Sequence, residues 1–66
     1  MENRIEELRR EEGLNQKEFA KLAGISRATL WAIETGRNKT MLASTMMSIA
    51  AALHRPVNEV FYTENV

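Results

Sequence analysis

Apolar residues along this 66-residue chain recur at the three- and four-residue spacing of amphipathic helices. The clearest example is residues 16–35, in which five apolar residues keep this spacing on either side of a break: Phe19, Ala23, Ile25, Leu30 and Ile33. Gly24 at the break suits the left-handed residue that ends a helix, and Ser26 suits the N-cap of the next one. The pattern predicts two short helices joined by a tight turn, the second covering about 27–35.

Two longer helices are predicted on either side of this pair. Residues 2–12 are rich in strong helix formers, with Ile5 and Leu8 on the inward face and Gly13 at the end. Thr40 is the expected N-cap of the helix that follows residue 35. This helix carries one apolar stripe that is expected to face the core: Leu42, Met46, Ile49, Ala50 and Leu53.

The end of the chain is predicted to hold one more short helix. Pro56 stops the preceding helix, and Asn58 is the expected N-cap of the last one. Three apolar residues are expected to close the core: Val57, Val60 and Phe61. Residues 61–66 then fit either a short strand or a frayed tail. The expected fold is all-α, with five helices in one domain that covers residues 1–66.

Two helices joined by such a turn are typical of a DNA-binding helix-turn-helix. With LNQ at 14–16, SRATL at 26–30 and IETG at 33–36, the chain resembles the Cro-type phage-repressor family, also called the xenobiotic-response-element type, from Arg4 to about Phe61. The resemblance implies a lambda-repressor-like domain with residues 27–35 in the major groove. Two differences from the family are His54, where a glycine is common, and the absence of a proline soon after residue 39.

Composition narrows the functional classes. Nine lysine and arginine residues balance nine acidic residues, so the total charge gives no general attraction to nucleic acid. The chain has no cysteine, no signal peptide and no apolar run of membrane-spanning length, which predicts a cytoplasmic protein without a membrane partner. It also lacks a nucleophile and base pair, a glycine-rich phosphate loop and a metal-ligand cluster. We therefore expect no enzyme activity, no cofactor and no metal.

The residues expected to contact DNA phosphates flank the predicted pair of helices. Asn15 is a good N-cap, with Glu18 completing a capping box, and the resemblance implies that Gln16 touches the DNA backbone. The basic loop after the second helix is well placed to clamp phosphates, although a merely solvated turn is the alternative. The full predicted set is Asn15, Gln16, Thr29, Arg37, Asn38 and Lys39.

The residues expected in the groove lie at the start and on the outer face of the second helix: Ser26, Arg27, Ala28 and Trp31. Arg27 can bind guanine or phosphate, and Ala28 or Trp31 can press on a thymine methyl group. Family members generally carry polar, base-reading side chains where Trp31 and Ala32 stand. The alternative for Trp31 is a packing residue that covers the helix edge or a partner.

One pair of charges is expected inside the domain. Arg9 falls on the flank of the inward face of its helix, and Glu34 lies beside Leu30 on the inner flank of another. The resemblance implies that these two residues form an ion pair across the core. Other charges on residues 2–12 are interpreted as a solvated surface.

Self-association is expected because one recognition helix reads too few base pairs for useful specificity. The predicted dimer interface is the outer side of the fourth helix and the chain end: Met47, Ala51, Val57, Val60 and Tyr62. The prediction is a dimeric repressor bound to a palindromic operator in double-stranded DNA. The alternative is an antitoxin-like member of the same fold that binds a protein through the Met47 and Tyr62 side or through Trp31.

Overall fold

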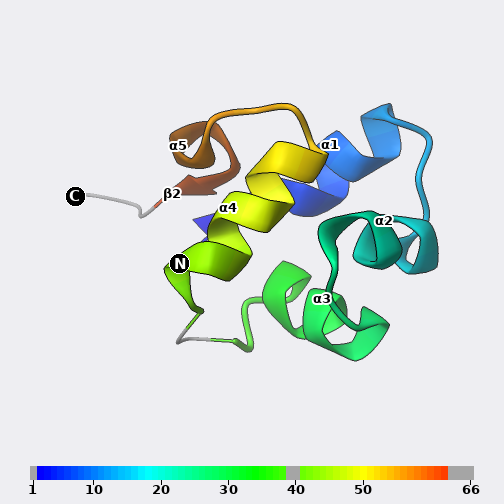
Figure 1. Cartoon of the computed structure of the whole chain (residues 1–66), viewed down its shortest axis with the longest axis horizontal. Coiled ribbons are helices and arrows are strands. Elements are labelled where there is room, and N and C mark those ends of the chain that lie inside the picture. Colours follow the sequence, from blue (N-terminus) through cyan, green and yellow to red (C-terminus); the bar gives the residue numbers. More distant parts are fainter. Residues whose placement is uncertain (1, 39–40, 63–66) are drawn as a thin grey trace.

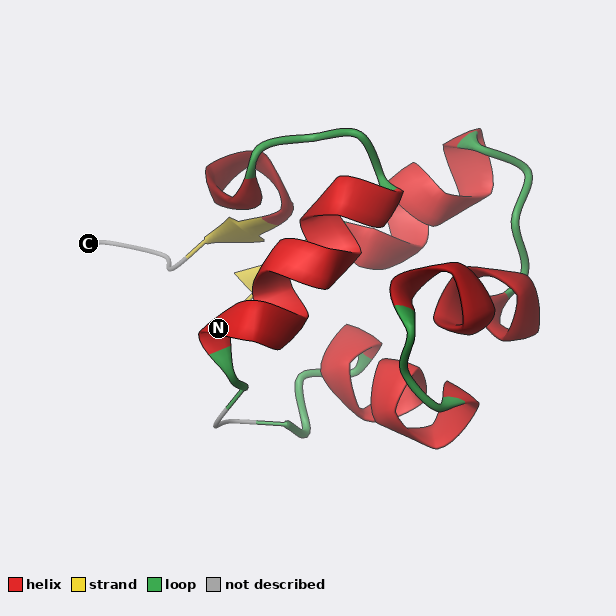
Figure 2. Ribbon diagram, in the orientation of Figure 1, coloured by secondary structure: helices red, strands yellow, loops and turns green. Residues whose placement is uncertain are grey.

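The computed structural model describes residues 2–38 and 41–62, and its elements follow one another as shown in Figure 1. The helices are α1 (Ile5–Glu11), α2 (Gln16–Ala23), α3 (Arg27–Glu34), α4 (Ala43–Ala52) and α5 (Val57–Val60). Two short strands, β1 (Glu2–Asn3) and β2 (Phe61–Tyr62), complete the described elements (Figure 2). The expected five-helix fold is therefore confirmed, with a small sheet added to it.

Local sequence signals explain where α2 begins and ends and where α3 begins. The Asn15 side chain accepts a hydrogen bond from the Glu18 N–H, and the Glu18 carboxylate accepts one from the Asn15 N–H, which is the predicted capping box. Ser26 caps α3 by accepting from the Thr29 N–H at 3.0 Å. Between the helices, Gly24 has φ 73°, a left-handed conformation that glycine adopts without a steric penalty.

The end of α4 shows the same kind of turn without a glycine. The His54 N–H donates to the Ala51 carbonyl and the Arg55 N–H donates to the Ala50 carbonyl, each at 3.1 Å. This pair of bonds closes the helix as a Schellman motif, which requires a left-handed residue. His54 supplies it at φ 57°, at the position where the resembling family often has glycine.

Helix α4 runs through the middle of the fold, with α1 and α5 on one side and α2 and α3 on the other (Figure 1). It packs against α2 and α5, and α2 also packs against α3. The largest fully buried side chains come from all five helices: Phe19, Ile5, Leu30, Ile33, Ile49, Leu53 and Val60. One shared apolar core thus holds α3 by its inner face.

The small sheet joins the two ends of the described chain. Strands β1 and β2 are antiparallel, with Glu2 opposite Tyr62 and Asn3 opposite Phe61. The Arg4 N–H adds a bond of 2.9 Å to the Val60 carbonyl. Of the two interpretations of the chain end, residues 61–62 thus form a strand, and it pairs within the chain. Residues 63–66 lie outside the described residues.

Three expectations about helix boundaries are wrong. Helix α1 begins at Ile5 because the residues before it pair with β2 instead of extending the helix. Helix α4 has Leu42 as its N-cap, so Leu42 lies outside the stripe and is 72% exposed rather than buried. Thr40, the expected cap, lies outside the described residues. Asn58 is inside α5, whose N-cap is Pro56.

The helices are also short relative to a bilayer. Within residues 2–38 and 41–62, none of them combines the length and the apolar character that crossing a membrane requires.

Candidate nucleic-acid interface

The candidate interface is built on α3, whose two faces differ sharply. Leu30 and Ile33 point into the core and are almost completely buried. Arg27, Ala28 and Trp31 on the opposite face are exposed. This division follows from the helical spacing of the apolar residues, and it leaves one side of α3 open along its length.

Most of the hydroxyl groups near this face are already engaged within the chain. The Ser26 hydroxyl donates to the Thr29 hydroxyl at 2.8 Å and also accepts from the Thr29 N–H. The Thr35 hydroxyl donates to the carbonyls of Trp31 and Ala32, at 2.8 and 3.3 Å. These side chains therefore stabilise the two ends of α3.

Trp31 is the most prominent feature of the open face. Its side chain is 47% exposed, so it is not part of the apolar core. The Arg37 guanidinium lies over its ring, 5.2 Å from the ring centroid, which is a cation–π contact. The contact forms because the chain reverses at Gly36, with φ 76°, and the Arg37 N–H then bonds to the Ala32 carbonyl at 2.8 Å.

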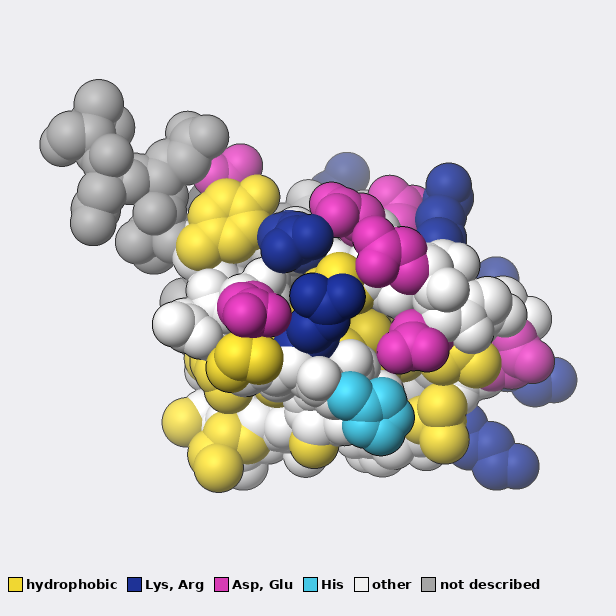
Figure 3. Space-filling view, turned by 90° about the horizontal axis from the view of Figure 1, so that it is seen from above, with side chains coloured by type: hydrophobic (Ala, Val, Ile, Leu, Met, Phe, Trp, Pro, Cys, Tyr) yellow, Lys and Arg dark blue, Asp and Glu magenta, His cyan; other side chains and the backbone are white. Residues whose placement is uncertain are grey.

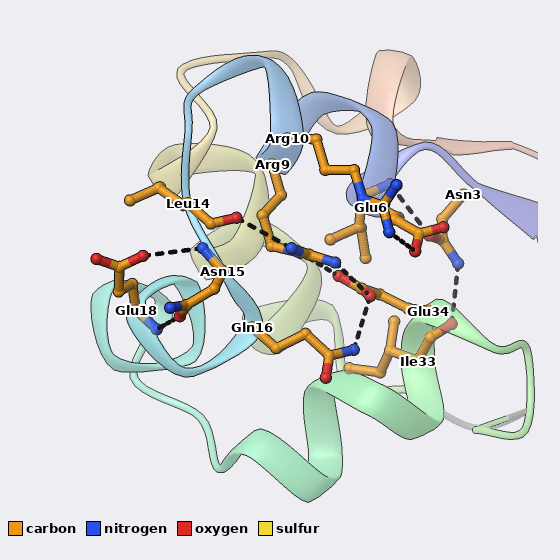
Figure 4. Close-up of polar contacts among 11 residues, drawn as sticks. Asn3, Glu6, Arg9, Arg10, Leu14, Asn15, Gln16, Glu18, Ile33 and Glu34 are labelled. Carbon is orange, nitrogen blue, oxygen red and sulfur yellow. Dashed lines mark hydrogen bonds and ion pairs between the residues drawn. The ribbon is translucent and has the colours of Figure 1, made fainter.

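Behind this face, a buried ion pair ties α3 to α1. The Arg9 Nε and Nη2 donate to the two carboxylate oxygens of Glu34 at 2.8 and 3.1 Å, and both side chains are over nine-tenths buried (Figure 4). The Arg9 Nη1 donates to the Leu14 carbonyl at 3.0 Å. The Glu34 carboxylate raises the pKa of Arg9 above its ordinary value, mainly through these hydrogen bonds, which outweigh the opposing effect of burial.

Gln16 joins the same cluster from the first turn of α2. Its Nε2 donates to the Glu34 Oε1 at 3.0 Å, as Figure 4 shows. The start of α2 and the end of α3 therefore lie together, and the Arg37 turn follows directly from that end of α3. Glu34 holds these parts in one arrangement because its carboxylate accepts from both α1 and α2.

Comparison with known proteins gives a match over almost the entire chain. A model of the helix-turn-helix domain, of the Cro and C1 repressor type, matches residues 3–66. The chain belongs to this family. The resemblance seen in the sequence is thus confirmed, and a helix-turn-helix domain implies DNA binding and DNA as a partner. Families of this kind are typically non-catalytic. No curated protein matches the chain.

The neutral total charge of this helix-turn-helix domain conceals an uneven distribution. Five of the acidic residues precede residue 13: Glu2, Glu6, Glu7, Glu11 and Glu12. Figure 3 shows acidic and basic side chains interspersed on the face away from α3. Basic residues dominate from α2 to the turn after α3, namely Lys17, Lys21, Arg27 and Arg37. Of the acidic residues in that stretch, Glu34 is buried in its ion pair and Glu18 belongs to the capping box.

The structure places the predicted phosphate residues in three groups. Asn15 and Gln16 lie at the start of α2, with Asn15 occupied in the capping box. Thr29 lies in the first turn of α3. Arg37 and Asn38 follow α3, and their N–H groups both donate to the Ala32 carbonyl. Lys39 lies outside the described residues.

The residues predicted for a dimer interface do not form one set. Met47, Ala51 and Tyr62 are exposed, and Met47 and Ala51 share one side of α4 with the exposed Ala43. Val57 is half-buried against the core. Val60 is fully buried within the protomer, so its side chain cannot contact a second chain. Val60 therefore closes the core, as expected, and is not an interface residue.

Asn3 is a contributor that sequence reasoning missed. Its Nδ2 donates to the Ile33 carbonyl at 2.9 Å, and its Oδ1 accepts from the Ile5 N–H at 3.1 Å. One side chain thus satisfies the first N–H group of α1 and anchors β1 to the end of α3. An asparagine two residues before the first inward apolar residue is a weak helix-start signal, and the run of helix formers that follows it favours a longer helix.

Proposed function

We propose that this helix-turn-helix protein is a sequence-specific transcription regulator, a repressor that acts as a dimer on a palindromic operator. The observation that carries the proposal is the open face of α3, which has the exposed cations Arg27 and Arg37 at its two ends, whereas five of the nine acidic residues precede residue 13. Repression follows most directly, since a domain of this size bound at a promoter blocks it by occupancy. A cytoplasmic location and a single domain over the whole chain belong to the same proposal.

The proposed contacts with DNA are of two kinds. Arg37 and Lys39 contact phosphates, because cations beside a recognition helix neutralise the DNA backbone without reading sequence. Gln16 joins them through the amide N–H that its bond to Glu34 leaves free. Arg27 and Trp31 enter the major groove, where side chains on the outer face of α3 reach the base edges.

Dimerisation is proposed to use the outer side of α4. Ala43, Met47 and Ala51 are spaced four residues apart, which places them on one side of the helix, and all three are exposed. Met47 is 64% exposed and flexible, which suits an adaptable apolar contact. Two half-sites read together supply the affinity and specificity that one α3 lacks.

A protein partner is the second proposal, and the exposed apolar residues favour it. Leu22 and Leu42 are large, exposed and far apart in the sequence, and neither has a role in the DNA scheme. A partner that covers either leucine would remove its apolar side chain from water, which favours binding. An antitoxin-like protein of the same fold would use such a surface to hold its target.

The deciding experiment measures binding to the DNA upstream of the protein's own gene and to a random duplex, at several salt concentrations. Arg37→Ala and Lys39→Ala should each reduce the salt slope by about one, and Lys39→Ala should weaken both duplexes alike. Arg27→Ala should cost roughly 1–3 kcal/mol on the upstream DNA and much less on the random duplex. Arg10→Ala is the matched control, because Arg10 lies on α1 and pairs with Glu6.

Two results would overturn parts of the proposal. If the three variants bind every duplex as the parent does, α3 and its loop are not a DNA interface, and copurification of a neighbouring gene's product becomes the test of the protein-partner proposal. If Met47→Glu sediments like the parent and binds DNA with the same affinity, the outer side of α4 is not the dimer interface.

A further inference from the structure

We infer that α3 reads its target through the C5-methyl groups of pyrimidines in the major groove, with Trp31 as the contacting side chain and Arg37 as the residue that positions it. This inference rests on the proposed DNA-binding function. It adds the chemical group that is recognised, which the fold by itself leaves open.

The first support is the shortage of hydrogen-bonding groups on the open face. Ala28 and Ala32 have none in their side chains, and the Thr35 hydroxyl is turned back onto helix carbonyls. The Thr29 hydroxyl oxygen accepts from the Ser26 hydroxyl at the start of the helix. The middle of α3 therefore offers a base edge an apolar surface, with the Arg27 side chain as a polar group at one end.

The second support is the chemistry of the groove. The thymine C5-methyl is the apolar group that an unmodified base pair presents in the major groove, and 5-methylcytosine presents the same group. The half-exposed Trp31 ring is the largest apolar surface on the open face of α3. Bringing the ring and the methyl together removes apolar area of both from water, and contact with the smaller C5–H of cytosine removes less.

The third support is the way in which Trp31 is held. The left-handed turn at Gly36 directs the chain back, and the Arg37 guanidinium lies 5.2 Å from the ring centroid. A ring held in place before binding loses less conformational freedom when it enters the groove. The Arg37 guanidinium also keeps N–H donors that can bind a DNA phosphate beside the contact between Trp31 and the methyl group.

The test begins by selecting duplexes with the full-length protein from a random 30-base-pair library. Each thymine of an enriched duplex is then replaced, one at a time, by deoxyuridine, which removes only the methyl group. We expect at least one thymine in each half-site at which this weakens binding by about fourfold, the value of one buried methyl. At that position, a 5-methylcytosine–guanine pair should bind about fourfold more tightly than a cytosine–guanine pair.

Two variants connect the effect to the named residues. Trp31→Ala should bind the thymine and deoxyuridine duplexes equally, and its exposed position means that thermal unfolding should stay close to that of the parent. Arg37→Lys keeps the charge but stacks less well on a ring, so it should keep the salt slope and lose part of the fourfold discrimination. A purely electrostatic role of Arg37 would leave that discrimination unchanged.

The outcomes separate the inference from the proposed function. If the selection enriches a sequence but no thymine responds to deoxyuridine, the domain reads DNA by other means and the inference is wrong. It is equally wrong if Trp31→Ala shows the same discrimination as the parent. If the selection enriches nothing, the proposed function fails, and the inference fails with it.

Discussion

Removing Arg9 should destabilise this domain more than removing any exposed charge, because the substitution isolates a buried carboxylate. The Glu34 side chain is only 4% exposed and accepts two hydrogen bonds from Arg9. In Arg9→Met, Gln16 remains as its neutral donor, which cannot balance the charge. Breaking one side of a buried pair costs about 3–5 kcal/mol, a large part of the total stability of a small domain.

The double variant Arg9→Met with Glu34→Leu should recover much of this loss, because it removes both charges and leaves apolar side chains in their place. The free energy of unfolding of the double variant should remain about 1–2 kcal/mol below that of the parent, because two hydrogen bonds are lost. The Leu14 carbonyl loses the donor supplied by Arg9, and the Gln16 amide loses its acceptor. Both losses concern hydrogen bonds that no apolar side chain can replace.

The assay is urea unfolding followed by circular dichroism, with Arg10→Met as the matched control. Arg10 lies on the same helix, its bond to Glu6 is 3.2 Å long, and both side chains are more than half exposed. Removing that pair should cost less than about 0.5 kcal/mol. If Arg9→Met costs no more than Arg10→Met, then Glu34 is effectively solvated, and the argument from burial is refuted.

Three further predictions concern stability. His54→Gly should stabilise the domain by about 0.5–1 kcal/mol, because glycine removes the left-handed strain at φ 57°, whereas His54→Ala should bring no such gain in thermal unfolding. Asn15→Ala should cost about 1 kcal/mol in the same assay through loss of the capping box, and an unchanged melting temperature would show that the cap is dispensable. The hydrogen bond from Arg4 lowers the pKa of Glu7 below its ordinary 4.5, so this stabilisation is present above that pH and lost as the pH falls through the lowered value. Glu7→Gln should therefore make the melting temperature less sensitive to acid, and parallel profiles of the two proteins would contradict the assignment.

The sequence predicted the helix-turn-helix well because strong local signals agree there. Asn15 with Glu18, Gly24, and Ser26 each satisfy backbone groups at a helix end, so propensity and capping place the boundaries together. The start of α4 had no such signal. Its N-cap Leu42 makes no capping hydrogen bond from its side chain, and Thr40, whose hydroxyl is a better cap, places the predicted start two residues too early.

The small sheet could not be predicted from local patterns. Neither Glu2 nor Asn3 favours a strand by itself, and only their pairing with Phe61 and Tyr62, far away in the sequence, makes them one. The same reason applies to the hydrogen bond from Asn3 to the Ile33 carbonyl, since the two residues are thirty positions apart. The contact between Trp31 and Arg37 likewise depends on the turn at Gly36, which brings a loop residue back over the helix.

Glu34 shows how stability and recognition share one group in this domain. Its Oε1 accepts from Arg9, which fixes α1, and from Gln16, which stands at the start of α2 among the proposed phosphate contacts. An unsupported glutamine on the surface would lose rotamer freedom on binding a phosphate, whereas Gln16 is already held. Substituting Glu34 would therefore disturb the core and the proposed interface together. Separating the two roles requires variants of Gln16 itself, which leave the buried ion pair in place.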